Sequence, residues 1–79
     1  MTIRHLKTFI KVAELGSISK TATELCIAQP SVSQTIKELE EYYNVSLFTR
    51  NNRNLTLTKD GLVLLEKARE TITRFDEFE

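Results

Sequence analysis

Residues 16–44 read GSISKTATELCIAQPSVSQTIKELEEYYN, and this stretch decides the fold. Ser17 and Ser19 are both suited to capping a short helix, in which apolar residues recur at i, i+4 and i+7. The pattern is interrupted over residues 26–29. Pro30 suits the first turn of a new helix, because a backbone N–H at that position has no acceptor within the helix and proline has no N–H to leave unpaired. Asn44 favours the left-handed conformation that ends a helix. The stretch therefore predicts two helices joined by a tight turn.

The flanking sequence adds a helix before this pair and a hairpin and a helix after it. Apolar residues follow helical spacing between Thr2, a suitable cap, and Gly16, a suitable stop. Beyond residue 44 the period changes, and the runs 47–49 and 55–57 suit two short strands joined by an asparagine-rich turn. Thr58 is placed to cap a final helix that continues to near the end of the chain.

These elements predict a mainly α fold, a winged helix-turn-helix with a small two-stranded wing and a long C-terminal helix. Seventy-nine residues are enough for one such domain and too few for a multi-domain enzyme. We expect residues 1–58 to form the winged helix-turn-helix domain and residues 59–79 to form a linker and dimerisation helix.

The residue inventory argues against an enzyme. No glycine-rich phosphate loop is present, and a catalytic cysteine–histidine pair would need Cys26 and His5, the single copies of each residue type. No cluster has metal-ligand spacing, so we expect no metal and no cofactor. Cys26 falls in the turn between two helices, where we expect a small buried apolar side chain.

Charge is unevenly distributed although the formal net charge is zero. Residues 1–59 carry eight Lys and Arg against five acids, and residues 60–79 carry three against six. No apolar run is longer than that at residues 62–65, which is far shorter than the roughly 18 residues that a bilayer requires, so we expect no membrane partner. The basic first part of the chain is the part suited to an anionic partner.

Hydrogen-bonding side chains occupy the predicted outer face of the helix that begins near Pro30, while Ile27 and Val32 are expected to be buried against the first helix. Gln34 is suited to bidentate contact with adenine, and Lys37 to a phosphate. From residue 42 to residue 59 the chain has no acid, and the basic hairpin suits contact with a DNA backbone or minor groove. Three glutamates in the second half of the helix would be repelled by phosphates, so only its first two turns are expected in a groove.

The motifs GSIS at residues 16–19, AQPSVSQ at 28–34 and LF at 47–48 resemble the N-terminal DNA-binding domain of LysR-type bacterial transcriptional regulators. The resemblance implies sequence-specific binding of double-stranded DNA by a cytoplasmic regulator whose effector-binding domain is absent from this chain. It also implies base or backbone contacts by the recognition helix and the wing. Combined with the face analysis, the expected DNA-binding residues are Gln29, Pro30, Ser31, Ser33, Gln34, Lys37, Arg50 and Arg53.

Two other interpretations remain open. The serine and glutamine cluster is also what an ordinary solvated helix face looks like, and a winged fold is also used by protein-interaction modules that bind no nucleic acid. A steep salt dependence of DNA binding would separate a DNA reader from such a module.

An apolar stripe on the last helix predicts a homodimer, with a tetramer as an alternative for the full-length protein. Leu65, Ala68, Ile72 and Phe75 follow a 3-4-3 spacing, as in a short coiled-coil seam. We expect this stripe to lie too far from the hairpin for all four residues to be needed in the core.

Overall fold

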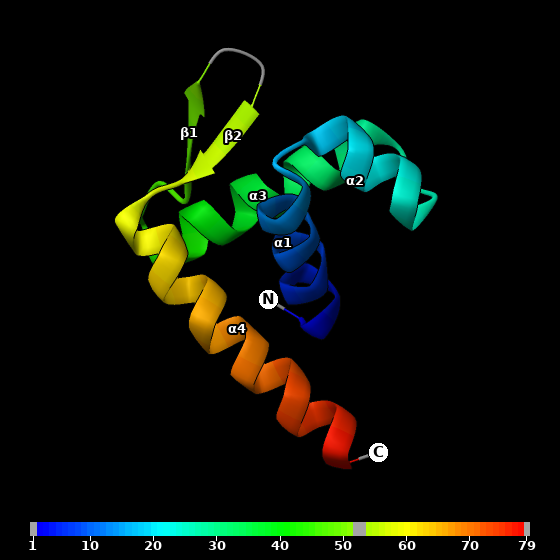
Figure 1. Ribbon diagram of the computed structural model, residues 1–79, viewed down its shortest axis with the longest axis vertical. Helices are drawn as coiled ribbons and strands as arrows, with labels where there is room; N and C mark the ends of the chain where they lie inside the picture. Colours follow the sequence, from blue (N-terminus) through cyan, green and yellow to red (C-terminus); the bar gives the residue numbers. More distant parts are fainter. Residues whose placement is uncertain (1, 52–53, 79) are drawn as a thin grey trace.

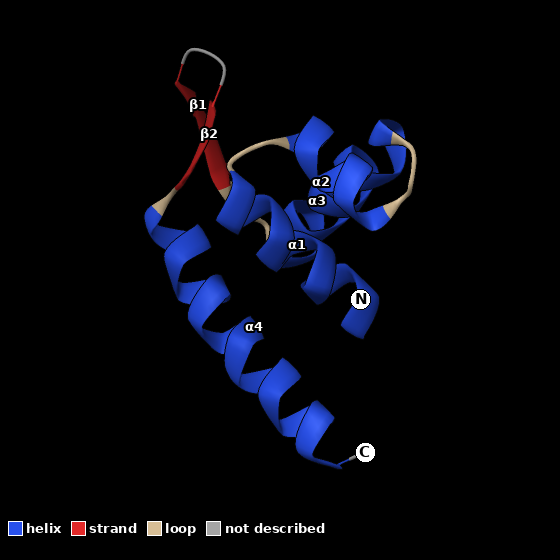
Figure 2. Ribbon diagram, turned by 45° about the vertical axis from the view of Figure 1, so that its right-hand side comes forward, coloured by secondary structure: helices blue, strands red, loops and turns tan. Residues whose placement is uncertain are grey.

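The computed structural model describes residues 2–51 and 54–78, which form four helices and a two-stranded antiparallel hairpin (Figures 1 and 2). The elements are α1 (Ile3–Leu15), α2 (Ile18–Leu25), α3 (Gln29–Tyr43), β1 (Phe48–Asn51), β2 (Asn54–Leu57) and α4 (Lys59–Phe78). The predicted mainly α fold with a small wing and a long last helix is confirmed.

Local capping chemistry sets the helix boundaries where the sequence predicted them. The Thr2 hydroxyl accepts a hydrogen bond from the His5 backbone N–H, and the His5 side chain binds the Thr2 N–H in return, forming a capping box. Gly16 ends α1 with a φ of 64°, and the Ser17 hydroxyl caps α2 by accepting from the Lys20 N–H at 3.1 Å. Asn44 ends α3 with a φ of 57°.

The turn between α2 and α3 differs from the sequence expectation at Cys26. This residue ends α2 in the left-handed conformation, with a φ of 58°, and its side chain is exposed. The prediction of a buried apolar role is therefore wrong, because the left-handed turn directs residue 26 out of the core. Ala28 precedes α3 without a side-chain cap, and Pro30 lies in the first turn as predicted.

The core lies where α1 crosses α2, α3 and α4. Phe9 and Val12 of α1 are fully buried, and the Phe9 ring packs at a centroid distance of 5.6 Å against Phe48 of the wing. The buried apolar residues are Leu6, Phe9, Val12, Ala22, Val32, Ile36, Leu39, Leu47 and Ala68. The single core therefore holds every element of the described chain together.

The backbone of one residue, Leu47, joins α3, the wing and α4. The Leu47 N–H donates to a carboxylate oxygen of Glu40 at 2.7 Å, and the Leu47 carbonyl accepts from the Thr58 N–H at 3.0 Å. The Thr58 hydroxyl caps α4 by accepting from the Gly61 N–H at 3.0 Å, as predicted, and donates to the Ser46 carbonyl at 2.6 Å. The base of the wing is thus fixed to both neighbouring helices.

We expect Glu40→Ala to destabilise the domain by about 1–3 kcal/mol, because the partly buried Leu47 N–H would lose its acceptor. Glu40→Gln keeps an acceptor oxygen and should recover part of the loss. Urea unfolding measures both free energies. The matched control is Glu41→Ala, an exposed neighbour, which should change stability by no more than about 0.5 kcal/mol. Equal effects of the substitutions at residues 40 and 41 would contradict a role for the Glu40 hydrogen bond.

The apolar stripe of α4 lies closer to the core than the sequence suggested. Ala68 is buried at 1% exposure, and Leu65 and Ile72 pack against the core cluster. Three of the four stripe residues therefore take part in the core, in which α4 contacts α1, and the expectation that not all four are needed there is consistent with the structure. Phe75, one turn further on, remains 37% exposed.

In the described part of the chain, no helix combines the length and the apolar character that are needed to cross a membrane.

Candidate nucleic-acid interface

Helix α3 has one buried and one exposed face, and the DNA-binding residues predicted on this helix lie on the exposed face. Val32, Ile36 and Leu39 point into the core. All six residues predicted on this helix are exposed, namely Gln29, Pro30, Ser31, Ser33, Gln34 and Lys37. Packing of the apolar side against α1 and α2 therefore presents a polar surface over the first two turns of α3.

The polar side chains of this face are available for binding. Within residues 2–51 and 54–78, the side chains of Gln29, Ser33 and Gln34 have no hydrogen-bond partner. The Thr35 hydroxyl, by contrast, donates to the carbonyl of Ser31 at 3.0 Å and is engaged by its own helix. The uncommitted amides and hydroxyl are the groups that hydrogen-bond to base edges and phosphates in other DNA readers.

The structure brings together three predicted residues from two different elements. Ser33 and Lys37 of α3 and Arg50 of β1 line one groove of about 200 Å³ between the helix and the wing. Arg50 lies opposite Leu55 in the hairpin, and Leu55 packs against the core beneath. The groove therefore carries two cations and a hydroxyl above an apolar floor, and its lining also includes Glu40, whose carboxylate accepts the Leu47 N–H. Arg53, the other predicted wing residue, lies outside the described residues.

The cations at this surface differ from those on the other side of α1. Neither Lys37 nor Arg50 forms an ion pair with a residue that the structure describes. Lys11, however, pairs with Glu24 at 3.1 Å and with Glu14 at 3.5 Å. Hydrogen bonding and the charge of Glu24 raise the pKa of Lys11 above its ordinary value. Within the described residues, Lys37 and Arg50 are therefore the cations of the α3–wing groove without a direct ion pair, although the Glu40 carboxylate lies in the same lining.

The acids in the second half of α3 have structural roles that the sequence did not indicate. Glu38 pairs with the ring of His5 at 3.2 Å, which links α3 to α1. Glu40 holds the Leu47 N–H at the base of the wing. We infer that Glu40 positions the wing relative to α3. No sequence signal pointed to it, because its partner lies seven residues away across a turn.

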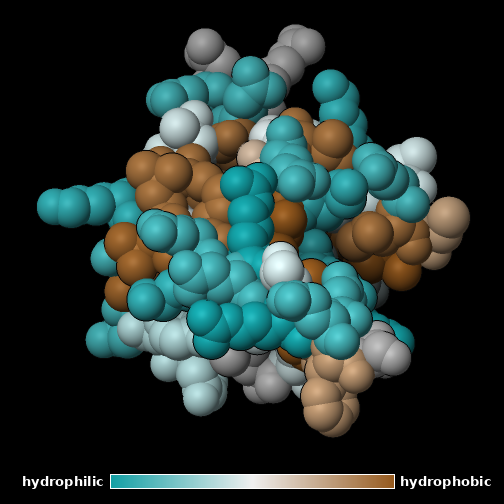
Figure 3. Space-filling view, turned by 60° about the horizontal axis from the view of Figure 1, so that its bottom comes forward, coloured by the Kyte–Doolittle hydropathy of each residue, from teal (hydrophilic) through white to brown (hydrophobic). Residues whose placement is uncertain are grey.

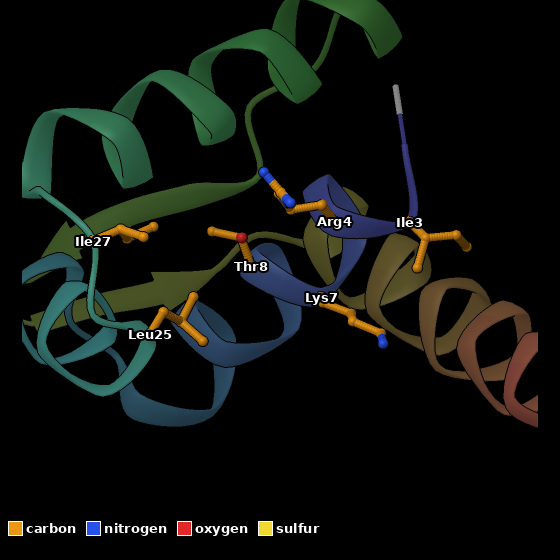
Figure 4. A pocket seen from close by; sticks show the side chains of 6 residues that line it. All are labelled: Ile3, Arg4, Lys7, Thr8, Leu25 and Ile27. Atoms are coloured by element: carbon orange, nitrogen blue, oxygen red, sulfur yellow. The ribbon is translucent and has the colours of Figure 1, made fainter.

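A second, larger groove of about 540 Å³ lies away from the α3–wing groove, along α1 (Figure 4). Leu25 and Ile27 lie at one end of it and Ile3 at the other, with Thr8 between them. Ile27 is 43% exposed, so the prediction that it packs in the core is wrong. It follows the left-handed residue 26, and this turn places it at the surface.

Comparison with known proteins gives consistent matches over nearly the whole chain. A family model described as bacterial regulatory helix-turn-helix protein, lysR family, matches residues 3–62. The uncharacterized HTH-type transcriptional regulator YbhD of Escherichia coli is 46% identical over 95% of this chain and 24% of its own length. The HTH-type transcriptional regulator BsdA of Bacillus subtilis is 41% identical over 98% of this chain and 27% of its own length. This chain therefore spans about a quarter of the length of either relative, and both relatives are regulators rather than enzymes.

Solved structures agree with the fold. A crystal structure of a BenM_DBD/benA site 1 DNA complex superposes with a TM-score of 0.93 at 36% identity, covering 99% of this chain and 91% of the other.

Proposed function

This chain belongs to the lysR family of bacterial regulatory helix-turn-helix proteins, and from that membership we propose that it is the operator-reading domain of a transcriptional regulator. In this proposal α3 enters the major groove of double-stranded DNA, and the wing contacts the backbone or the minor groove. The proposed contact residues are those predicted from the sequence, Gln29, Pro30, Ser31, Ser33, Gln34, Lys37, Arg50 and Arg53.

The observation that carries the proposal is the groove shared by Ser33, Lys37 and Arg50. Two unpaired cations and a free hydroxyl on adjoining elements suit a DNA phosphate. A phosphate held there would orient α3, so that the amides of Gln29 and Gln34 could reach base edges. An α-helix with its side chains is about 10–12 Å wide, which fits a major groove of about 12 Å.

A related structure supports the choice of partner. The BenM_DBD structure, which covers nearly the same length of chain, is a complex with DNA. A protein that binds operator DNA in a bacterium works in the cytoplasm, and this is the location we propose.

A protein-interaction module that binds no nucleic acid is the other candidate. The exposed Ile27 and the groove along α1 are features that such a module would use. The unpaired cations of the α3–wing groove favour DNA instead.

We expect Gln34→Ala to weaken binding at the preferred site by about 1–3 kcal/mol and to relax base preference at one position, because a bidentate amide contact would be lost. Selection of bound sequences from random duplexes, followed by fluorescence anisotropy on the preferred site, measures both effects. The control is Thr73→Ala, an exposed residue of α4, which should leave affinity and preference unchanged. An equal loss on every sequence would instead identify Gln34 as a backbone contact.

A homodimer through α4 is part of the proposal, with a tetramer as an option for the full-length protein. Two copies related by a two-fold axis would present two copies of α3 to successive major grooves. The contact predicted from the sequence used Leu65, Ala68, Ile72 and Phe75. Ala68 is buried in the core of its own chain, whereas Leu65 and Ile72 are partly buried and Phe75 is 37% exposed, so these last three are the stripe residues that a partner could contact.

A further inference from the structure

The groove along α1, which we call the α1 groove, is separate from the surface proposed to bind DNA. Its volume of about 540 Å³ is within the usual range of ligand sites, and it shares no lining residue with the α3–wing groove. The described residues that line it are Ile3, Arg4, Lys7, Thr8, Leu25 and Ile27. None of the proposed DNA contacts is among them, so a partner in this groove leaves those contacts available.

Apolar side chains form the two ends of the α1 groove. Leu25 and Ile27 lie at one end and Ile3 at the other (Figure 4). Ile27 is 43% exposed, and in Figure 3 apolar side chains gather on the right-hand side of the molecule, where Figure 1 has the turn between α2 and α3. Exposed apolar side chains at a groove with a polar rim are typical of protein contact sites.

The lining between the two ends includes a buried threonine whose hydroxyl has no hydrogen-bond partner. Thr8 and Thr21 are the polar residues that the described chain buries, at 4% and 0% exposure. The Thr21 hydroxyl donates to the carbonyl of Ser17 at 2.7 Å, whereas the Thr8 hydroxyl makes no hydrogen bond within residues 2–51 and 54–78. Every fully enclosed polar side-chain atom of the described chain has a partner, so the Thr8 hydroxyl keeps some access to solvent. An unpaired hydroxyl in the lining of a groove favours a ligand that supplies the partner.

The polar rim of the α1 groove is basic. Arg4 and Lys7 are exposed, lie three residues apart on α1, and form no ion pair with a described residue. Lys11, one turn further on, is instead paired with Glu24 and Glu14. The charged ends of Arg4 and Lys7 point in opposite directions in Figure 4, so a single small anion would not reach both. A segment that carries several carboxylates would reach both.

We propose that the α1 groove binds an acidic, amphipathic segment of another protein while α3 and the wing hold DNA. Apolar side chains of this segment fill the two ends of the groove, beside Ile27 and Ile3. Its carboxylates pair with Arg4 and Lys7, and an oxygen between them accepts from the Thr8 hydroxyl. A helix with apolar residues at i, i+3, i+4 and i+7 and acids beside them offers groups in this arrangement. The inference goes beyond DNA reading, because it gives the domain a second partner.

Binding of a synthetic peptide to the 79-residue chain tests the site. The probe is a fluorescein-labelled helix with leucine at i, i+3, i+4 and i+7 and glutamate at the flanking positions, and the control peptide has lysine in place of each glutamate. Fluorescence anisotropy should show binding of the acidic probe only. Ile27→Asp and Arg4→Glu should each raise its dissociation constant about tenfold, because like charges would face one another. Lys20→Glu, an equal change of charge at an exposed residue outside the groove, should leave the constant within about twofold.

Thr8→Val separates a binding role of the hydroxyl from a structural one. Valine has nearly the shape of threonine, so loss of an unpaired hydroxyl should leave the melting temperature of the free chain unchanged or higher. The same substitution should raise the dissociation constant of the acidic probe about threefold or more, because a hydrogen bond to the probe is lost. Thermal unfolding and anisotropy measure the two effects. A lower melting temperature with unchanged affinity would overturn the assignment of Thr8 to the site.

The preferred operator duplex shows whether the two partners bind separately. At physiological salt, charges more than about 8 Å apart are largely screened, so a saturating duplex should change the probe affinity by no more than about threefold. In nuclear magnetic resonance spectra of the isotope-labelled chain, the probe should shift signals around the α1 groove and leave those of Ser33, Lys37 and Arg50 in place.

Three results would overturn the proposal. They are no probe binding at high micromolar concentration, displacement of the probe by the duplex, and equal effects of Arg4→Glu and Lys20→Glu in chains that circular dichroism shows to be folded. Probe binding at the α1 groove by a chain that binds no duplex would overturn the proposed function alone.

Discussion

Raising the salt concentration from 50 to 200 mM is expected to lower the affinity of the chain for its preferred operator about a thousandfold. Lys37, Arg50 and Arg53 of each copy are expected to contact about three phosphates, so two copies would contact about six. Release of counterions from about six phosphates lowers the affinity by a factor of that size. Fluorescence anisotropy at several salt concentrations gives the slope of log affinity against log salt.

Single substitutions make this test specific to the α3–wing groove. Lys37→Gln should reduce the slope by about one for each copy bound, because one phosphate contact is removed. Lys11→Gln is the control, since Lys11 is already paired with Glu24 and Glu14, and it should leave the slope unchanged. A slope near zero for the unmodified chain would favour the protein-interaction module.

Gly61→Ala is expected to lower the free energy of unfolding by about 2–3 kcal/mol and the melting temperature by roughly 10 °C or more. A methyl group on residue 61 would collide with the carbonyl oxygen of Leu47 and would lie 2.8 Å from a methyl of Leu57. That carbonyl is held by the Thr58 N–H, so the backbone itself must move. The better helix propensity of alanine offsets at most about 1 kcal/mol of the cost.

Thermal unfolding followed by circular dichroism measures the effect. Leu62→Ala, at the neighbouring exposed position, should lower the melting temperature by only a few degrees. A Gly61→Ala chain as stable as the unmodified one would show that α4 does not need this close approach to the wing.

The helices and strands could be predicted from the sequence because their boundaries are set by interactions between residues close together in the chain. Helices begin or end through hydrogen bonds or backbone conformations that involve only near neighbours in the sequence. The residues that do this are Thr2, Gly16, Ser17, Asn44 and Thr58. The exposed face of α3 was predictable for the same reason, since the apolar period of one helix also defines its polar side.

Sequence could not predict which partner covers each apolar face. The stripe through Ala68 has the spacing of a coiled-coil seam, yet Leu65, Ala68 and Ile72 pack into or against the core of the same chain. Ile27 is apolar and closely follows α2, but the left-handed backbone at Cys26 turns it outward. The Glu40–Leu47 hydrogen bond depends on how two elements meet across a turn. The periodic pattern of apolar residues does not predict that geometry.

The junction at Leu47 has a consequence for the length of DNA that a paired molecule spans. Because Glu40, Thr58 and Gly61 all meet this one residue, the direction of α4 is fixed relative to α3. Its 20 residues extend about 30 Å at 1.5 Å per residue. In a dimer paired along α4, the separation of the two reading helices is thus a fixed property of the protein. The number of base pairs between operator half-sites would then be set by the direction in which α4 leaves the wing. Each residue inserted into α4 before the region that pairs would rotate one copy of α3 by about 100° relative to the other.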